Sequence, residues 1–148
     1  MRTWTTETTL PAPPDAVLFA LTDPEACARW APLPFDLDED TDRLRTGTRT
    51  RVCGKLGGVR VGFDVEVFHA GDDRLELAAD GPGVAMDVAY DVVGRECGGS
   101  EVRASVSLRP KGGLTGRLVA QAAGALLSAG ALEQAVSRIA REAVPTCC

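Results

Sequence analysis

The chain has 148 residues, the length of one ordinary domain, and its 45% hydrophobic and 25% charged residues exclude an intrinsically disordered or collagen-like protein. With 16 Lys and Arg against 21 Asp and Glu, the net charge of -5 disfavours a surface that binds nucleic acid. We therefore expect one globular domain whose core depends on aliphatic residues, since only 5% of the residues are aromatic.

A strand opens the chain, and two short helices follow it. Residues 2–10 alternate at a period of two, which is typical of a half-buried strand, with one side formed by Trp4, Thr6, Thr8 and Leu10. A proline-rich segment ends this strand and starts a helix over 15–21. Asp23 is a suitable N-cap for a second helix that ends near Trp30.

From Phe35 to Leu108 the period of two continues and predicts an antiparallel meander, whose first long strand spans 43–52. Glycine-rich segments that favour tight turns separate the strands. Apolar side chains fall on one side of each strand and charged ones on the other. The side chains expected to face inward are Trp4, Thr6, Thr8, Thr48, Thr50, Val61, Phe63, Val65, Leu75, Leu77, Met86, Val88, Tyr90, Val92, Val102 and Val106.

A helical period replaces the strand pattern after residue 113 and predicts one long helix over 114–143, which Pro145 closes. Its apolar stripe consists of Leu118, Ala122, Ala125, Ala129, Leu132, Val136, Ile139 and Ala143. This stripe is expected to cover the apolar face of the sheet. Its many small residues either leave space between helix and sheet or let the helix lie closer.

Three segments, at 8–14, 17–24 and 28–32, resemble the START-related polyketide cyclase/dehydrase and lipid-transport superfamily. The resemblance implies an α+β helix-grip fold, in which a sheet of about seven antiparallel strands wraps around one long C-terminal helix. It covers the chain as a single domain, 1–148, with an ordered core of about 2–144 and a tail at 145–148. It also implies that Trp30 closes one rim of a cavity, although the favoured interpretation is that Trp30 only pins its helix to the sheet.

The predicted function is the binding of a hydrophobic small molecule, such as a lipid or polyketide, in an apolar cavity between the sheet and the C-terminal helix. The alternative is a polyketide aromatase or cyclase that positions its substrate and uses hydroxyl donors. The one titratable inward group is Tyr90, which is either a catalytic candidate or a core tyrosine with one hydrogen-bond partner. The predicted ligand-binding residues are Trp30, Thr48, Thr50, Val61, Phe63, Val65, Leu77, Met86, Val88, Tyr90, Val106, Leu118 and Ala122.

Neither a cofactor nor a metal site is expected, because the single histidine, His69, and five scattered cysteines lack the spacing of metal ligands. The cysteines favour a reducing, cytoplasmic location, and the terminal pair, Cys147 and Cys148, is expected to be a frayed tail. No signal peptide, membrane insertion or nucleic-acid partner is expected. Lysine occurs only at 55 and 111, which indicates a GC-rich, bacterial genome. Whether the chain forms a homodimer stays open.

Overall fold

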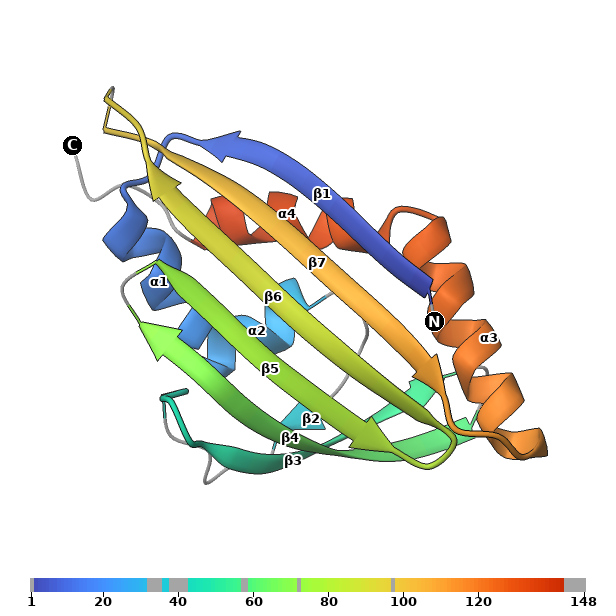
Figure 1. The fold of residues 1–148 in the computed structure, drawn as a ribbon. Coiled ribbons are helices and arrows are strands. Elements are labelled where there is room, and N and C mark those ends of the chain that lie inside the picture. The colour runs from blue at the N-terminus through green and yellow to red at the C-terminus, as the bar shows by residue number, and fades with distance from the viewer. Residues whose placement is uncertain are drawn as a thin grey trace.

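A curved antiparallel sheet with helices on one face forms the architecture (Figure 1). It is seen in a computed structural model that describes residues 2–31, 36–37, 43–56, 59–71, 73–96 and 98–142. The elements in chain order are β1 (Arg2–Leu10), α1 (Pro14–Thr22), α2 (Pro24–Trp30), β2 (Asp36–Leu37), β3 (Arg49–Leu56), β4 (Val59–Gly71), β5 (Arg74–Gly81), β6 (Val84–Gly94), β7 (Ser100–Pro110), α3 (Leu114–Ser128) and α4 (Ala131–Glu142). The predicted α+β class is confirmed.

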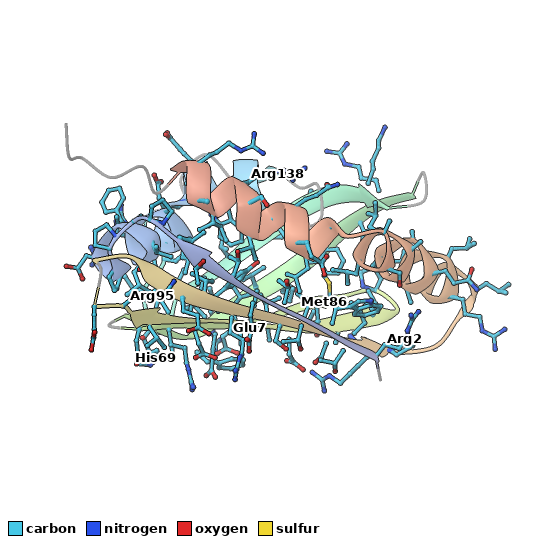
Figure 2. The ribbon with its side chains drawn as sticks, turned by 90° about the horizontal axis from the view of Figure 1, so that it is seen from above. Arg2, Glu7, His69, Met86, Arg95 and Arg138 are labelled. Atoms are coloured by element: carbon cyan, nitrogen blue, oxygen red, sulfur yellow. The ribbon has the colours of Figure 1, made fainter. Side chains whose placement is uncertain are left out.

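The sheet follows the order β1-β7-β6-β5-β4-β3-β2, and every neighbouring pair is antiparallel. It is therefore a meander from β2 to β7 with β1 added beside β7. The expected number of about seven strands is corrected to six long strands, because β2 is only a two-residue extension beside β3. Figure 2 shows that the sheet curves, so that β3 and β4 rise toward the helices.

The alternation predicted from the sequence assigns the two faces of the sheet correctly. We call the face covered by the helices the inner face and the opposite one the outer face. Val88 of β6 lies between Leu77 of β5 and Val106 of β7, and all three are inner-face residues. Trp4 of β1 is opposite Val106 and continues this row. Because side chains alternate between the two faces along a regular strand, the face of one residue determines the faces of the remaining residues.

The two N-terminal helices form where the sequence predicts them. Pro14 occupies the first turn of α1, where the missing backbone N–H costs little. The Asp23 carboxylate accepts a hydrogen bond from the backbone N–H of Glu25 at 3.2 Å and so caps α2. Trp30 ends α2, and its indole Nε1 donates to the carbonyl oxygen of Ala20 in α1 at 2.9 Å. This bond ties the two helices together.

The first long strand of the meander begins later than predicted. Residues 43–48 are a loop with a turn at Thr46 and Gly47, and β3 starts at Arg49. Gly47 has a φ of 91°, a left-handed conformation that favours glycine and interrupts a strand. The backbone N–H of Gly47 donates to the carbonyl oxygen of Val67 at 2.8 Å, so the loop still follows the edge of β4.

The prediction of a single long C-terminal helix is wrong, since α3 and α4 are separate helices that run in different directions (Figure 1). Gly130 lies between them with a φ of 98°, and its N–H donates to the carbonyl oxygen of Leu127 at 3.2 Å. This left-handed glycine is a common helix C-terminus. Figure 2 shows α4 above the sheet and α3 over one end of it.

The helix break changes which residues of α3 are buried. The predicted apolar stripe assumes one uninterrupted helix across residue 130 and so places Leu118 inward, but Leu118 is 56% exposed. The buried residues of α3 are Gly116, Val119, Ala123, Gly124 and Leu127. The prediction succeeds on α4, where Leu132, Val136 and Ile139 are buried.

Within the described residues, no helix combines the length and the apolar character needed to span a membrane. The predicted tail at 145–148, including Cys147 and Cys148, lies outside the described residues, as does Ala143.

Candidate functional site

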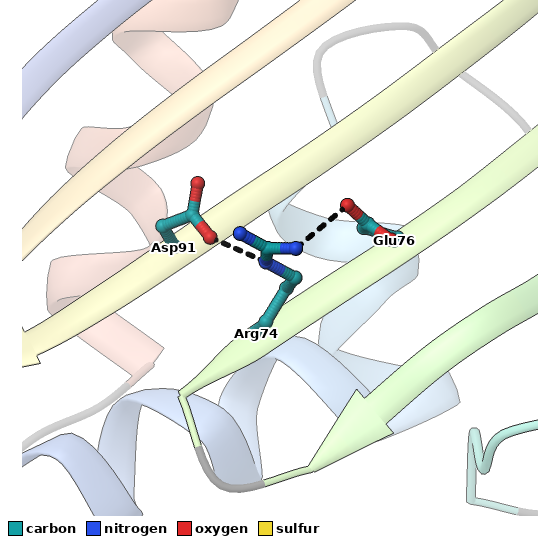
Figure 3. A network of polar contacts seen from close by, with 3 residues as sticks. All are labelled: Arg74, Glu76 and Asp91. Atoms are coloured by element: carbon teal, nitrogen blue, oxygen red, sulfur yellow. Dashed lines mark hydrogen bonds and ion pairs between the residues drawn. The ribbon is translucent and has the colours of Figure 1, made fainter.

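The candidate site is the inner face of the sheet, whose described strand positions from β3 to β7 carry no charged side chain. The charged residues of these strands point outward, where several form ion pairs. Arg74 illustrates this arrangement, with its Nε 2.7 Å from Asp91 Oδ1 and its Nη1 3.1 Å from Glu76 Oε1 (Figure 3). Because unpaired charges are costly to bury, this separation gives the β3 to β7 part of the inner face an apolar surface. On β1, Arg2 is opposite the inner-face residue Leu108, and its Nη2 donates to Ser128 Oγ of α3 at 3.4 Å.

Most of the predicted ligand-binding residues come together on this face. Figure 2 shows Met86 between the sheet and the helices, with His69 on the opposite side. The predicted residues that share the inner face of the sheet are Thr50, Val61, Phe63, Val65, Leu77, Met86, Val88, Tyr90 and Val106.

The middle of the inner face is less buried than its surroundings. Val65, Leu77 and Val88 are half-buried, and cross-strand pairing makes Leu77 and Val88 direct neighbours. By contrast, Leu75 and Tyr90, the next inward pair along the same two strands, are fully buried. The burial of the inner-face residues therefore decreases from this packed end toward the middle of the sheet.

Tyr90 lies at the packed end of this face and is fully buried. Its hydroxyl oxygen has no hydrogen-bond partner among the described residues. Burial, followed by the electrostatic effect of Cys27, raises the pKa of the Tyr90 phenol above its usual range. The phenol is therefore a neutral hydrogen-bond donor at physiological pH. The expectation that its hydroxyl finds one protein partner is not met.

Residues of α2 surround the Tyr90 ring. The Trp30 ring meets it edge-on, with ring centroids 5.2 Å apart and an interplanar angle of 79°. Cys27 is buried one helical turn before Trp30, and its Sγ donates to the carbonyl oxygen of Leu21 at 3.2 Å. Burial, together with Asp23, raises the pKa of the Cys27 thiol to about 12. This thiol is therefore protonated and chemically inert at neutral pH.

Sequence reasoning did not select Cys27 as a neighbour of Tyr90. A signal for it exists, because positions 27 and 30 are three residues apart on one helix and so share a face. Which strand residue that face would meet is not encoded in the spacing.

Three of the predicted ligand-binding residues lie elsewhere. Thr48 is in the loop before β3, where its hydroxyl accepts a hydrogen bond from the backbone N–H of Arg45 at 2.9 Å. Leu118 is exposed on the outward side of α3, and Ala122 of the same helix is half-buried. The structure therefore brings the strand residues of the predicted site together and separates Thr48 and Leu118 from them.

A groove of about 280 Å³ lies on the outer face. Its outward lining consists of Phe68, Glu76, Asp87, Ala89, Ser105 and Ser107. Glu76 and Asp87 are paired with Arg74 and Arg109, so the groove has a charged rim. Leu77 and Val88 also border it, whereas Val65 is not among its lining residues. Its polar rim makes it less suited than the inner face to an apolar ligand.

A family model described as polyketide cyclase/dehydrase and lipid transport matches residues 1–144. The chain belongs to this family. A comparison with curated proteins finds no significant match in sequence. The family model therefore confirms the resemblance predicted from the sequence.

Solved structures of other proteins share this family fold. Protein BH1534 of Bacillus halodurans is 16% identical, with 97% of this chain and 98% of that chain covered and a TM-score of 0.69. A START superfamily protein from Mycobacterium smegmatis is 15% identical, with 94% and 97% covered and a TM-score of 0.65. At these identities the likeness concerns the fold alone.

A third structure is more similar in sequence. DynU16, described as a protein in the dynemicin biosynthetic locus, is 27% identical to this family member and has a TM-score of 0.59. The match covers 94% of this chain but 46% of DynU16. This chain therefore corresponds to about half the length of DynU16.

Proposed function

We propose that this family member binds a hydrophobic small molecule on the inner face of its sheet. The observation that carries the proposal is the separation of charge: the described inner-face positions of β3 to β7 carry none, while ion pairs such as Arg74 with Asp91 lie on the outer face. Apolar surface of this kind favours a lipophilic ligand because its burial removes apolar area from water.

The ligand is expected to contact the half-buried middle of the sheet, at Val65, Leu77 and Val88. Met86 and Val106 extend this surface on the same face. The relationship to DynU16 supports a biosynthetic metabolite as the ligand, since that protein is described by its place in a biosynthetic locus.

Binding is better supported than cyclisation. General acid–base catalysis requires a titratable group near its working pH. Tyr90 is the one such group at the described inner-face positions of β3 to β7, and its raised pKa moves it away from neutral pH. We therefore propose a binding protein in preference to a polyketide cyclase.

Fluorescence titration with Nile red, a neutral lipophilic dye, tests the proposal on two adjacent variants. Val88→Trp places a large ring on the inner face, where the ligand is proposed to bind, and is expected to weaken dye binding at least tenfold. Ala89→Trp is the matched control, because Ala89 follows Val88 in β6 and lines the outer groove. Equal losses in both variants, or loss only in Ala89→Trp, would refute an inner-face site. Thermal unfolding of both variants checks that each is folded at the titration temperature.

A further inference from the structure

We propose that the groove on the outer face of the sheet binds a small organic cation, with the alkylammonium group of the ligand over the ring of Phe68. The groove has a volume of about 280 Å³, and Phe68 lines it with 53% of its surface exposed. Ligand-binding depressions combine apolar or aromatic side chains with a few polar groups. The site is independent of the proposed inner-face function, because the two surfaces lie on opposite faces of the sheet.

An irregularity in β4 exposes the Phe68 ring. Between Val67 and His69 the pairing of β4 with β5 shifts, and Phe68 is the extra residue, with no partner on β5. Such β-bulges redirect a side chain and are frequent beside functional sites. Phe68 therefore lies outside the core, at the one position where the described pairing of these two strands departs from a regular register.

The other described aromatic rings that reach the surface already carry a cation. Arg43 Cζ lies 3.8 Å from the centroid of the Phe19 ring. Arg2 Cζ lies 4.7 Å from the centroid of the Trp4 ring. A positive charge over the face of an aromatic ring is attracted by the electrons of the ring. Within the described part of the chain, neither lysine nor arginine is placed in this way over Phe68, so its ring face is open to a cation from outside.

The charged side chains that line the groove are both acidic. They are Glu76 and Asp87, and neither lysine nor arginine is among the described lining residues. Arg109 neutralises Asp87, with its Nε 3.2 Å from Asp87 Oδ2. Arg74, by contrast, contacts the carboxylates of both Glu76 and Asp91, so one negative charge of these three groups is not compensated (Figure 3). This charge favours a positively charged ligand on the Glu76 side of the groove.

The small residues of the groove add hydrogen-bond acceptors. Ala89 of β6 is opposite Ser105 of β7, and Asp87 is opposite Ser107. The hydroxyl oxygens of Ser105 and Ser107 can accept hydrogen bonds from an ammonium group. A neutral molecule of the same shape would gain the apolar contact but not the electrostatic attraction, and an anion would be repelled by the carboxylates.

Three soluble probes with one ring separate the effect of charge from that of shape. They are cyclohexylammonium, cyclohexanol and cyclohexanecarboxylate, each titrated into isotope-labelled protein at the same ionic strength. Two-dimensional NMR measures each Kd and identifies the backbone amides whose signals shift. We expect cyclohexylammonium to bind most tightly and the carboxylate most weakly, with the largest shifts at the residues that line the groove. Equal affinities for cyclohexylammonium and cyclohexanol, or shifts confined to other surfaces, would overturn the proposal.

Phe68→Leu keeps an apolar side chain but removes the aromatic face. It should weaken cyclohexylammonium binding about two- to fivefold relative to cyclohexanol binding. Phe19→Leu is the matched control, because it removes an exposed ring that Arg43 already covers. It should leave the ratio of the two Kd values unchanged. An unchanged ratio in Phe68→Leu, or an equal change in Phe19→Leu, would overturn the recognition of the cation by Phe68.

The variants Val88→Trp and Ala89→Trp distinguish this site from the inner face. Ala89→Trp places a large ring in the groove and should abolish cyclohexylammonium binding, whereas Val88→Trp should retain it. The opposite pattern is expected for Nile red, so each site can fail without the other. Loss of cyclohexylammonium binding in Val88→Trp alone would place the cation outside the groove and overturn the proposal.

A lysine side chain of a partner protein carries the same ammonium group as a free amine. Acetyl-lysine methylamide, in which only the side-chain amine is charged, therefore serves as a fourth probe. We expect it to bind more weakly than cyclohexylammonium, because its flexible side chain loses more conformational entropy on binding. Tighter binding of this probe would assign the groove to a protein partner and overturn a small-molecule ligand.

Discussion

The indole of Trp30 meets the phenol of Tyr90 edge-on, with 5.2 Å between the ring centroids, and so joins α2 to the inner face of β6. In a chain with only 5% aromatic residues, this pair is a large share of the aromatic packing. Edge-to-face pairs are favourable because the positive ring edge meets the negative ring face. The contact holds the two N-terminal helices against the sheet, since Trp30 also donates to Ala20 of α1.

Trp30→Ala should therefore lower the free energy of unfolding by about 3–5 kcal/mol, because it removes a large buried ring and leaves a cavity. Trp30→Phe keeps an aromatic ring beside Tyr90 but loses the hydrogen bond to Ala20 O, and we expect a loss of about 1–2 kcal/mol. Urea denaturation followed by circular dichroism measures both. An equal loss in the two variants would contradict the separate contributions of ring and hydrogen bond.

Tyr90→Phe and Ser100→Ala should have opposite effects on the ligand-free protein. Removing the unpaired Tyr90 hydroxyl relieves a buried group without a partner and should raise the free energy of unfolding by about 1 kcal/mol. Removing the Ser100 hydroxyl breaks its bond to Ala12 O and should lower it by about 1 kcal/mol. Urea denaturation of the two variants decides the signs. A large destabilisation by Tyr90→Phe would mean that the hydroxyl has a partner in the free protein.

Cys27 should resist alkylation in the native protein. Its thiol pKa of about 12, against an ordinary 9.0, lowers the thiolate fraction at pH 8 by roughly a thousandfold. Iodoacetamide treatment at pH 8 with peptide mass mapping should label Cys27 only when denaturant is added. Rapid labelling without denaturant would contradict its burial.

The same pKa shift predicts a loss of stability in alkali. The folded state holds the Cys27 proton more tightly than the unfolded state, so this contribution is fully present below about pH 9 and is lost as the pH rises toward about 12. Tyr90 acts in the same direction at higher pH, since its pKa is also raised. Urea midpoints measured from pH 8 to 10.5 should fall less steeply in Cys27→Ala than in wild type. Parallel curves would contradict the contribution of this thiol.

Two glycines of α3 should respond differently to alanine. A Cβ on Gly116 would lie 2.5 Å from the Cα of Gly83 in the β5–β6 turn, where backbone must move to make room. A Cβ on Gly124 would lie 3.4 Å from Arg2 Nη1, the end of a flexible side chain. We expect Gly116→Ala to lower the melting temperature and Gly124→Ala to hold or raise it, because alanine is the better helix former by about 1 kcal/mol. Similar shifts in both variants would contradict a close approach at Gly83.

The features that the sequence predicts correctly are those controlled by neighbouring residues. The inner-face positions of β4 to β7 follow from alternation, because adjacent side chains on a strand must point to opposite faces. The start of α2 follows from the cap at Asp23 and the proline after it. These signals are local, so they survive in any tertiary arrangement, and they were sufficient to place Val65, Leu77 and Val88 on one surface.

Contacts between distant segments decided the rest. Gly130 could sit inside a helix or end one, and the separate packing of α3 on one end of the sheet and α4 beside β1 favours the break. That choice turns Leu118 outward. The unpaired hydroxyl of Tyr90 likewise depends on α2, about 60 residues earlier in the chain, whose nearby donors bond to carbonyl oxygens of α1. Alternation orients a side chain toward the interior, but its hydrogen-bond partners are supplied by whichever elements pack against it.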